Sequence, residues 1–156
     1  MIIVYGEQAT GKSTFAIGML KNRKNALYLS MDRDNSLIES LVESKIDFSY
    51  LEYGYLMDIK YSILERGGLM NNTLEYVVID SINHIRDNKT YKEKIEYLAQ
   101  LEKDFNIKMA VVLNKLNKMD KMDRLIDSMG YKSIDTGSIR RPERLRMARQ
   151  IPLPIS

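Results

Sequence analysis

The stretch that decides the fold is Gly6-Glu7-Gln8-Ala9-Thr10-Gly11-Lys12-Ser13, which directly follows the apolar run Ile2–Tyr5. It fits the pattern G-x-x-x-x-G-K-[ST] at every fixed position. The glycines let backbone N–H groups approach phosphate oxygens, and a helix that begins near Lys12 adds its positive N-terminal dipole. Lys12 would then reach the β- and γ-phosphates, and the Ser13 hydroxyl would bind Mg²⁺. The predicted nucleotide-binding residues are Gly6, Glu7, Gln8, Ala9, Thr10, Gly11, Lys12, Ser13 and Thr14.

The composition is that of a single globular domain. The chain has 156 residues, of which 44% are hydrophobic and 29% charged, enough for a packed core and a solvated surface. The absence of cysteine excludes disulfides, thiolate metal sites and a cysteine nucleophile, and a single histidine, His84, argues against histidine-rich metal sites and histidine-based hydrolase triads. The longest apolar runs, such as Met109–Leu113, are far shorter than the roughly 20 residues of a membrane span, and Met1 leads into Ile2–Tyr5 without a signal-peptide pattern. We therefore expect one cytoplasmic domain over residues 1–156, with no membrane partner.

Apolar runs of strand length alternate with stretches of helical period, which favours an α/β fold with a mostly parallel sheet. The strand candidates are Ile2–Tyr5, Ala26–Ser30, Phe48–Leu51, Tyr76–Ile79 and Met109–Leu113. The helix candidates are Phe15–Leu20, Leu37–Val42, Leu56–Ile63, Tyr91–Phe105 and Met122–Met129. We expect the third helix to stop at Gly67-Gly68 and the fifth at Gly130, because glycine accepts the left-handed C-cap conformation. The pattern predicts a three-layer sandwich around about five strands, and after Tyr131 it dissolves into a polar segment.

A partner for the predicted magnesium ion follows another buried strand. Four apolar residues, Tyr76–Ile79, lead directly to Asp80 and Ser81. A strand-terminal aspartate can also cap the helix that follows it. Beside a phosphate loop we favour the metal-side role, with Ser13 and Asp80 as the metal residues.

The order of these segments resembles the RecA-type ATPase core, the group that includes RecA, archaeal RadA, KaiC and DnaB-type helicases. Over about residues 1–118, the phosphate loop is followed by Leu27-Tyr28-Leu29-Ser30-Met31-Asp32, then by Val77-Val78-Ile79-Asp80-Ser81 and Val111-Val112-Leu113-Asn114-Lys115. The resemblance implies a P-loop NTPase fold of RecA-like type, like the short single-domain recombinase paralogues of archaea, phages and archaeal viruses. It also implies that Lys12 and Ser13 bind ATP and Mg²⁺ and that Asp80 orders the water shell of the metal.

The resemblance assigns two further catalytic positions. An acidic residue, usually glutamate, ends the second strand of these proteins and polarises the attacking water. Asp32 matches it and is one methylene shorter, with Asp34 as a substitute, so we expect slow ATP turnover, since misplacing a water by about 1 Å can cost roughly a hundredfold. A polar sensor often ends the fourth core strand, and here Asn114 or Lys115 could take that role. Lys115 could equally be an exposed lysine.

The C-terminal part of the chain is basic. Residues 132–149 contain six basic and two acidic side chains, a net charge of +4, against +3 for the whole chain. Three roles are open for this segment: contact with DNA phosphates, an arginine finger for a neighbouring subunit, or a solubilising tail. The candidate residues are Arg140, Arg141, Arg144 and Arg146.

We therefore expect a Mg²⁺-dependent ATPase that acts in DNA recombination, repair or replication, with single-stranded DNA and as a homo-oligomer or beside a recombinase partner. A small P-loop kinase is the main alternative, in which Met31–Asp34 would hold a substrate hydroxyl and the arginines would form a lid. A slow nucleotide-gated switch is a third. Asn117-Lys118-Met119-Asp120 matches the guanine-reading N-K-x-D motif, but it lies beyond the strand end, and Asp80–Asn83 lacks the glycine of D-x-x-G, which argues against GTP.

Overall fold

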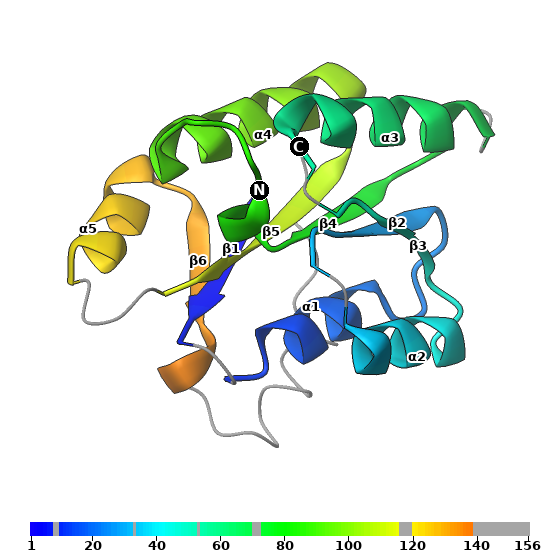
Figure 1. Ribbon diagram of the computed structural model, residues 1–156, viewed down its shortest axis with the longest axis horizontal. Helices are drawn as coiled ribbons and strands as arrows, with labels where there is room; N and C mark the ends of the chain where they lie inside the picture. The colour runs from blue at the N-terminus through cyan, green and yellow to red at the C-terminus, as the bar shows by residue number, and fades with distance from the viewer. Residues whose placement is uncertain (8–9, 33, 53, 70–72, 116–119, 139–156) are drawn as a thin grey trace.

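The computed structural model describes residues 1–7, 10–32, 34–52, 54–69, 73–115 and 120–138. Within these residues, six parallel strands form one sheet in the order β3-β2-β4-β5-β1-β6 (Figure 1). The strands are β1 (Ile2–Gly6), β2 (Ala26–Ser30), β3 (Asp47–Tyr50), β4 (Tyr76–Asp80), β5 (Lys108–Asn114) and β6 (Lys132–Asp135). The helices are α1 (Lys12–Leu20), α2 (Asn35–Glu43), α3 (Leu56–Leu69), α4 (Tyr91–Phe105) and α5 (Asp120–Met129), with short 3₁₀ turns η1 (Ile82–His84) and η2 (Thr136–Ser138).

Helices cover both faces of the sheet, as Figure 1 shows, with α1 and α2 on one side and α3 and α4 on the other. Two separate apolar clusters fill the layers. One joins alternate strand residues such as Ile3 and Val77 to α3, α4 and α5, and the other joins Val4 and Val78 to α1 and α2. The continuous apolar character of the central strands follows from this burial on both faces. The predicted α/β architecture with helices around a parallel sheet is confirmed.

The structure differs from the sequence prediction at two elements. It adds the sixth strand, β6, which pairs with β1 at the edge of the sheet and in which only Ile134 is buried. A short edge strand with one buried apolar side chain shows no clear alternation of apolar and polar residues. The sequence pattern therefore predicted only a polar segment here. Helix α3 also continues past the predicted stop at Gly67-Gly68, whereas Gly130 ends α5 with a φ of 74° as predicted.

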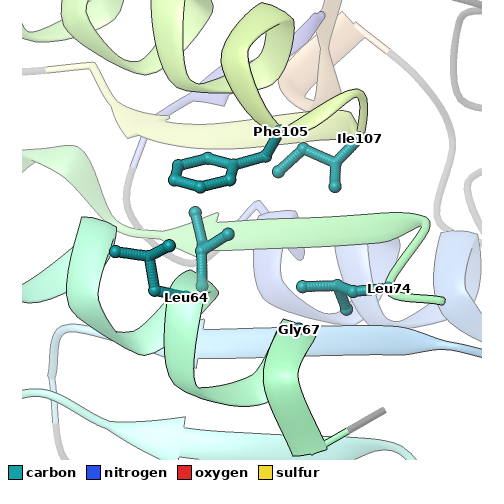
Figure 2. Close-up of a pocket in the computed structure, with 6 residues that line it drawn as sticks. Leu64, Gly67, Leu74, Phe105 and Ile107 are labelled. Carbon is teal, nitrogen blue, oxygen red and sulfur yellow. The ribbon is translucent and has the colours of Figure 1, made fainter. Parts of the chain in front are cut away.

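A small apolar cavity lies against α3 on the side away from the sheet's carboxyl edge (Figure 2). Its volume is about 80 Å³, and it is lined by Ile63, Leu64, Gly67, Leu74, Phe105 and Ile107. A Cβ atom added to Gly67 would meet nothing within 4 Å. The glycine in this helix is therefore not required by close packing.

The parallel arrangement brings the carboxyl ends of four central strands to one edge, where ligands of open α/β sheets bind. In the strand register, Gly6 lies beside Asn114, and Asp80 lies beside both Ser30 and Val112. The residues that follow β1, β2, β4 and β5 therefore meet above this edge. Among the described residues, no helix is both long and apolar enough to cross a membrane.

Candidate functional site

The turn after β1 needs glycine at both of its fixed positions. Gly6 has a φ of 156°, and a Cβ there would lie 2.7 Å from Thr136 Oγ1 and 2.8 Å from Thr10 Oγ1. Gly11 takes the left-handed conformation, with φ 77° and ψ 26°, immediately before α1 begins at Lys12. A side chain at either position would be strained, so the local sequence fixes a tight turn that opens into a helix N-terminus. Gln8 and Ala9 lie outside the described residues.

The predicted phosphate-binding lysine is folded onto its own loop. Lys12 is 6% exposed, and its Nζ donates to the Glu7 carbonyl oxygen at 2.5 Å. The Thr10 hydroxyl donates to the same carbonyl at 2.7 Å. Burial lowers the pKa of the Lys12 ammonium, and the charges of Asp80 and Asp135 oppose that shift. This cation is thus partly desolvated and bound to a neutral oxygen, which an anionic ligand could replace.

The two predicted metal residues lie in direct contact. Ser13 Oγ donates to Asp80 Oδ2 at 2.6 Å, although the residues are 67 positions apart. Asp80 is 7% exposed, and the hydroxyl of the fully buried Tyr28 donates to the same oxygen. Burial raises the pKa of Asp80, while the hydrogen bonds from Ser13 and Tyr28 and the nearby Lys12 charge act in the opposite direction. Burial and the Asp80 charge raise the pKa of Tyr28 well above its usual value, so it stays a donor.

The chemistry of this pair fits a magnesium ion. Among the described residues, no cluster of three or more His, Cys, Asp or Glu side chains could hold a metal by itself. Mg²⁺ bound to nucleotides commonly takes only one or two protein oxygens, with phosphates and waters filling the remaining positions. A hydroxyl and a carboxylate 2.6 Å apart supply those two oxygens. Thr14, on the first turn of α1, is exposed.

The two aspartates after β2 have different surroundings. Asp34 is the N-cap of α2: its Oδ1 accepts from the Ser36 N–H at 3.0 Å, the Ser36 hydroxyl at 2.7 Å and the Leu37 N–H at 3.3 Å. The hydrogen bond from Ser36 lowers the pKa of Asp34. The Asp32 carboxylate is 68% exposed, and its Oδ2 lies 3.8 Å from Nε2 of His84. Asp32 is therefore the aspartate of this connection that remains available to a ligand.

These groups surround one hollow of about 100 Å³ at the carboxyl edge. It is lined by Ser13, Ser30, Asp32, Asp34, Leu37, Asp80, Ser81, His84 and Asn114. The two predicted sensor residues diverge here. Asn114 lines the hollow, whereas the Lys115 side chain turns to α5 and its Nζ lies 2.9 Å from Asp123 Oδ2, a hydrogen bond that raises the pKa of Lys115.

Asn83 is a residue of this region that sequence reasoning missed. Its Oδ1 accepts from the Asn114 N–H at 2.7 Å and from the Ser81 hydroxyl at 2.9 Å. Its Nδ2 donates to the Asn114 carbonyl at 3.0 Å and to the Tyr91 hydroxyl at 3.3 Å. All four hydrogen-bonding positions of the amide are used, and they join the ends of β4 and β5. Its position, three residues after the strand-terminal Asp80, is the sequence signal that could have identified Asn83.

Two predicted features fall outside the described part of the chain. One is the set of candidate arginines, Arg140, Arg141, Arg144 and Arg146. The other is the N-K-x-D stretch, of which the structure describes only Asp120, the first residue of α5. A scan against models of known protein families gives no match, and neither does a search of the curated proteins.

Proposed function

We propose that this protein is a Mg²⁺-dependent ATPase core of RecA-like type with slow turnover. The observation that carries the proposal is the contact between Ser13 and Asp80, 2.6 Å apart, beside a turn in which two glycines precede a helix N-terminus. A structural turn needs glycines, but it does not need a lysine buried over the loop and a buried carboxylate facing the serine hydroxyl. Together these groups are suited to a triphosphate and its divalent ion.

The chain's own residues take the following roles in hydrolysis. Lys12 leaves the Glu7 carbonyl and pairs with the β- and γ-phosphate oxygens, where it offsets charge that develops in the transition state. Ser13 and Asp80 hold the magnesium ion, which neutralises phosphate charge when it is bound. Asp32 accepts a proton from the water that attacks the γ-phosphorus. The new oxygen–phosphorus bond forms as the bond to the β–γ bridging oxygen breaks, and ADP leaves.

The short carboxylate explains why we expect the rate to be low. Asp32 reaches less far than the glutamate that the resemblance leads one to expect, and its side chain is largely exposed. A base held loosely over the reacting water is misplaced for part of the time, and 1 Å of misplacement can cost about a hundredfold. Turnover is therefore expected well below the common enzyme range of roughly 1–1000 per second.

The proposed setting is DNA recombination, repair or replication, with single-stranded DNA as the partner and with assembly as a homo-oligomer or beside a recombinase. The support is the resemblance over residues 1–118 and the net charge of +4 on residues 132–149. Arginine-rich segments bind phosphate backbones by displacing counterions, which makes the affinity depend on salt. DNA binding therefore has a signature that can be measured separately from hydrolysis.

The test is an ATPase assay with and without single-stranded DNA across a salt series, together with nucleotide binding by calorimetry. Lys12→Ala should abolish both, whereas Lys24→Ala, which removes an exposed lysine outside the site, should change neither. GTP in place of ATP tests the base preference. The absence of a binding heat with every nucleotide tested would refute the proposal, and transfer of phosphate to an added nucleoside in place of water would favour a kinase.

A further inference from the structure

The single histidine of the chain lies at the hollow where hydrolysis is proposed to occur. His84 lines it together with Ser13, Asp32 and Asp80. Its Nε2 is 3.8 Å from Asp32 Oδ2, a separation that a small rotation of either partly exposed side chain closes to a hydrogen bond. The two residues are 52 positions apart and come from different strand ends, β2 and β4. Their meeting is a product of the fold.

The backbone that carries His84 is held firmly. Turn η1 is capped by the Ser81 hydroxyl, which accepts from the Asn83 N–H, and the His84 N–H donates to the Ser81 carbonyl at 3.2 Å. On either side, Ile82 and Ile85 are buried in the core, and Asn83 is fixed by four hydrogen bonds. The fold therefore sets where the His84 side chain leaves the backbone, and from there its imidazole can orient an exposed neighbour.

Asp32 is that neighbour. Its backbone is anchored, because the Ser30 hydroxyl donates to the Asp32 carbonyl at 2.5 Å. Its carboxylate is 68% exposed, and the side chain that lies 3.8 Å from its Oδ2 is His84. Asp34 differs from it, since Asp34 Oδ1 accepts three hydrogen bonds from the first turn of α2 and is committed to capping that helix.

We propose that His84 is a positioning residue for the water-activating Asp32, which rests on the proposed ATPase function. The Nε2–H group of His84 donates to Asp32 Oδ2 and directs Oδ1 toward the attacking water. In the step itself, the water proton passes to Oδ1, the water oxygen bonds to the γ-phosphorus, and ADP departs with the bridging oxygen. His84 gives up no proton and touches no phosphate.

The charges that face His84 suit a donor. Asp32 and Asp34 approach from the connection after β2, and Asp80 approaches from β4. A neutral imidazole offers one N–H, and neighbouring carboxylates favour placing it toward them. The role therefore needs the N–H group and does not need a positive charge.

The experiment is a double-mutant cycle on the full chain, read as kcat with saturating ATP and Mg²⁺. His84→Leu should lower kcat about ten- to hundredfold, the range expected for loss of orientation of a catalytic base, with nucleotide affinity unchanged. His84→Gln, whose amide N–H reaches a similar position, should keep most of the activity. In an Asp32→Asn background, His84→Leu should have no further effect, because there is no base left to orient.

Lys89→Leu is the matched control, since it places a leucine at an exposed position just beyond η1 and outside the hollow. The 45% exposure of the His84 side chain makes folding of the leucine variant expected. If thermal melting shows otherwise, His84→Asn, which stays polar but is too short to reach Asp32, replaces it. Full activity of His84→Leu, or an equal loss with and without the Asp32 carboxylate, would overturn the positioning role. Nucleotide binding without any hydrolysis by the unmodified protein would instead overturn the proposed ATPase function, and the role of His84 with it.

Discussion

Replacing Asp80 by asparagine should make the protein more stable and unable to use magnesium. The asparagine amide keeps an oxygen that can accept from Ser13 and Tyr28, so both hydrogen bonds of the native carboxylate can persist. What the substitution removes is a charge in a site that is 7% exposed. Functional sites commonly hold such charges at a cost in stability. We expect a gain on the order of 1 kcal/mol, or about 2–4 °C in Tm for a domain of this size.

The gain should depend on pH in a definite direction. Burial raises the pKa of Asp80, so between its usual value of 3.8 and the raised value the folded state binds more protons than the unfolded state. The stability of the unmodified protein therefore falls as the pH rises through that window, and the Asp80→Asn variant lacks this loss. The difference in Tm should be full above the raised pKa and should shrink as the pH is lowered through it, because the native carboxyl then becomes neutral too.

The assay is thermal melting of both proteins from pH 4 to pH 8, with and without MgATPγS. At a ligand concentration one hundred times the Kd, the unmodified protein should gain about 2.7 kcal/mol, and Asp80→Asn should lose most of that gain. Ser13→Ala provides a comparison that removes the hydroxyl and keeps the charge. The reasoning is refuted if Asp80→Asn is less stable at pH 8, or if magnesium raises its Tm as much as that of the unmodified protein.

Three further substitutions give separate tests. Gly67→Ala should raise the free energy of unfolding in urea by about 0.5–1 kcal/mol, because its methyl group enters open space beside the cavity in Figure 2, and an unchanged midpoint would contradict this. Asp34→Ala should cost about 1 kcal/mol of stability at pH 7 by removing the α2 cap, but it should leave ATP turnover largely intact. Because the pKa of Asp34 is lowered, this cost should vanish as the pH falls below that pKa. A large loss of kcat would show instead that Asp34 acts on water. Asn83→Asp replaces two N–H donors by a carboxylate oxygen that faces the Asn114 carbonyl. It should lower the free energy of unfolding by about 1–3 kcal/mol and slow hydrolysis. A melting temperature equal to that of the unmodified protein would rule out the bridge between β4 and β5.

The elements that the sequence predicted well are those with strong local signals. The central strands are apolar throughout because helices cover both faces, and α4 matches its predicted bounds, Tyr91–Phe105, with Thr90 as a capping residue. Edge strand β6 lacked such a signal, since its stability comes from pairing with β1. Gly67 shows the opposite failure: a glycine permits a helix stop but does not require one, and α3 continues through Gly67 and Gly68 to Leu69.

The same division holds for the site. The spacing of the glycine-rich turn is local, so its glycine positions and the lysine could be read directly from the sequence. The pairing of Ser13 with Asp80 was expected from the strand-terminal position of Asp80 beside the G-x-x-x-x-G-K-[ST] pattern and from the resemblance to the RecA-type core. No sequence pattern indicated that His84 would face Asp32, or that Lys115 would pair with Asp123, since each contact depends on how two connections fold over the sheet edge.

The closed loop has a consequence for how a nucleotide would enter. The Glu7 carbonyl accepts from both Lys12 and Thr10, and the Thr10 hydroxyl also lies 2.8 Å from that of the fully buried Thr136. A triphosphate that takes Lys12 replaces a neutral acceptor with a charged one, and charge-assisted hydrogen bonds are about twice as strong as neutral ones. Because the ammonium is already partly desolvated in the closed loop, less of its hydration remains to be removed when the phosphate arrives. The burial that lowers the pKa of Lys12 thus favours exchange of the carbonyl for phosphate, and the same exchange leaves the Thr10 hydroxyl as the remaining side-chain donor to the Glu7 carbonyl among the described residues.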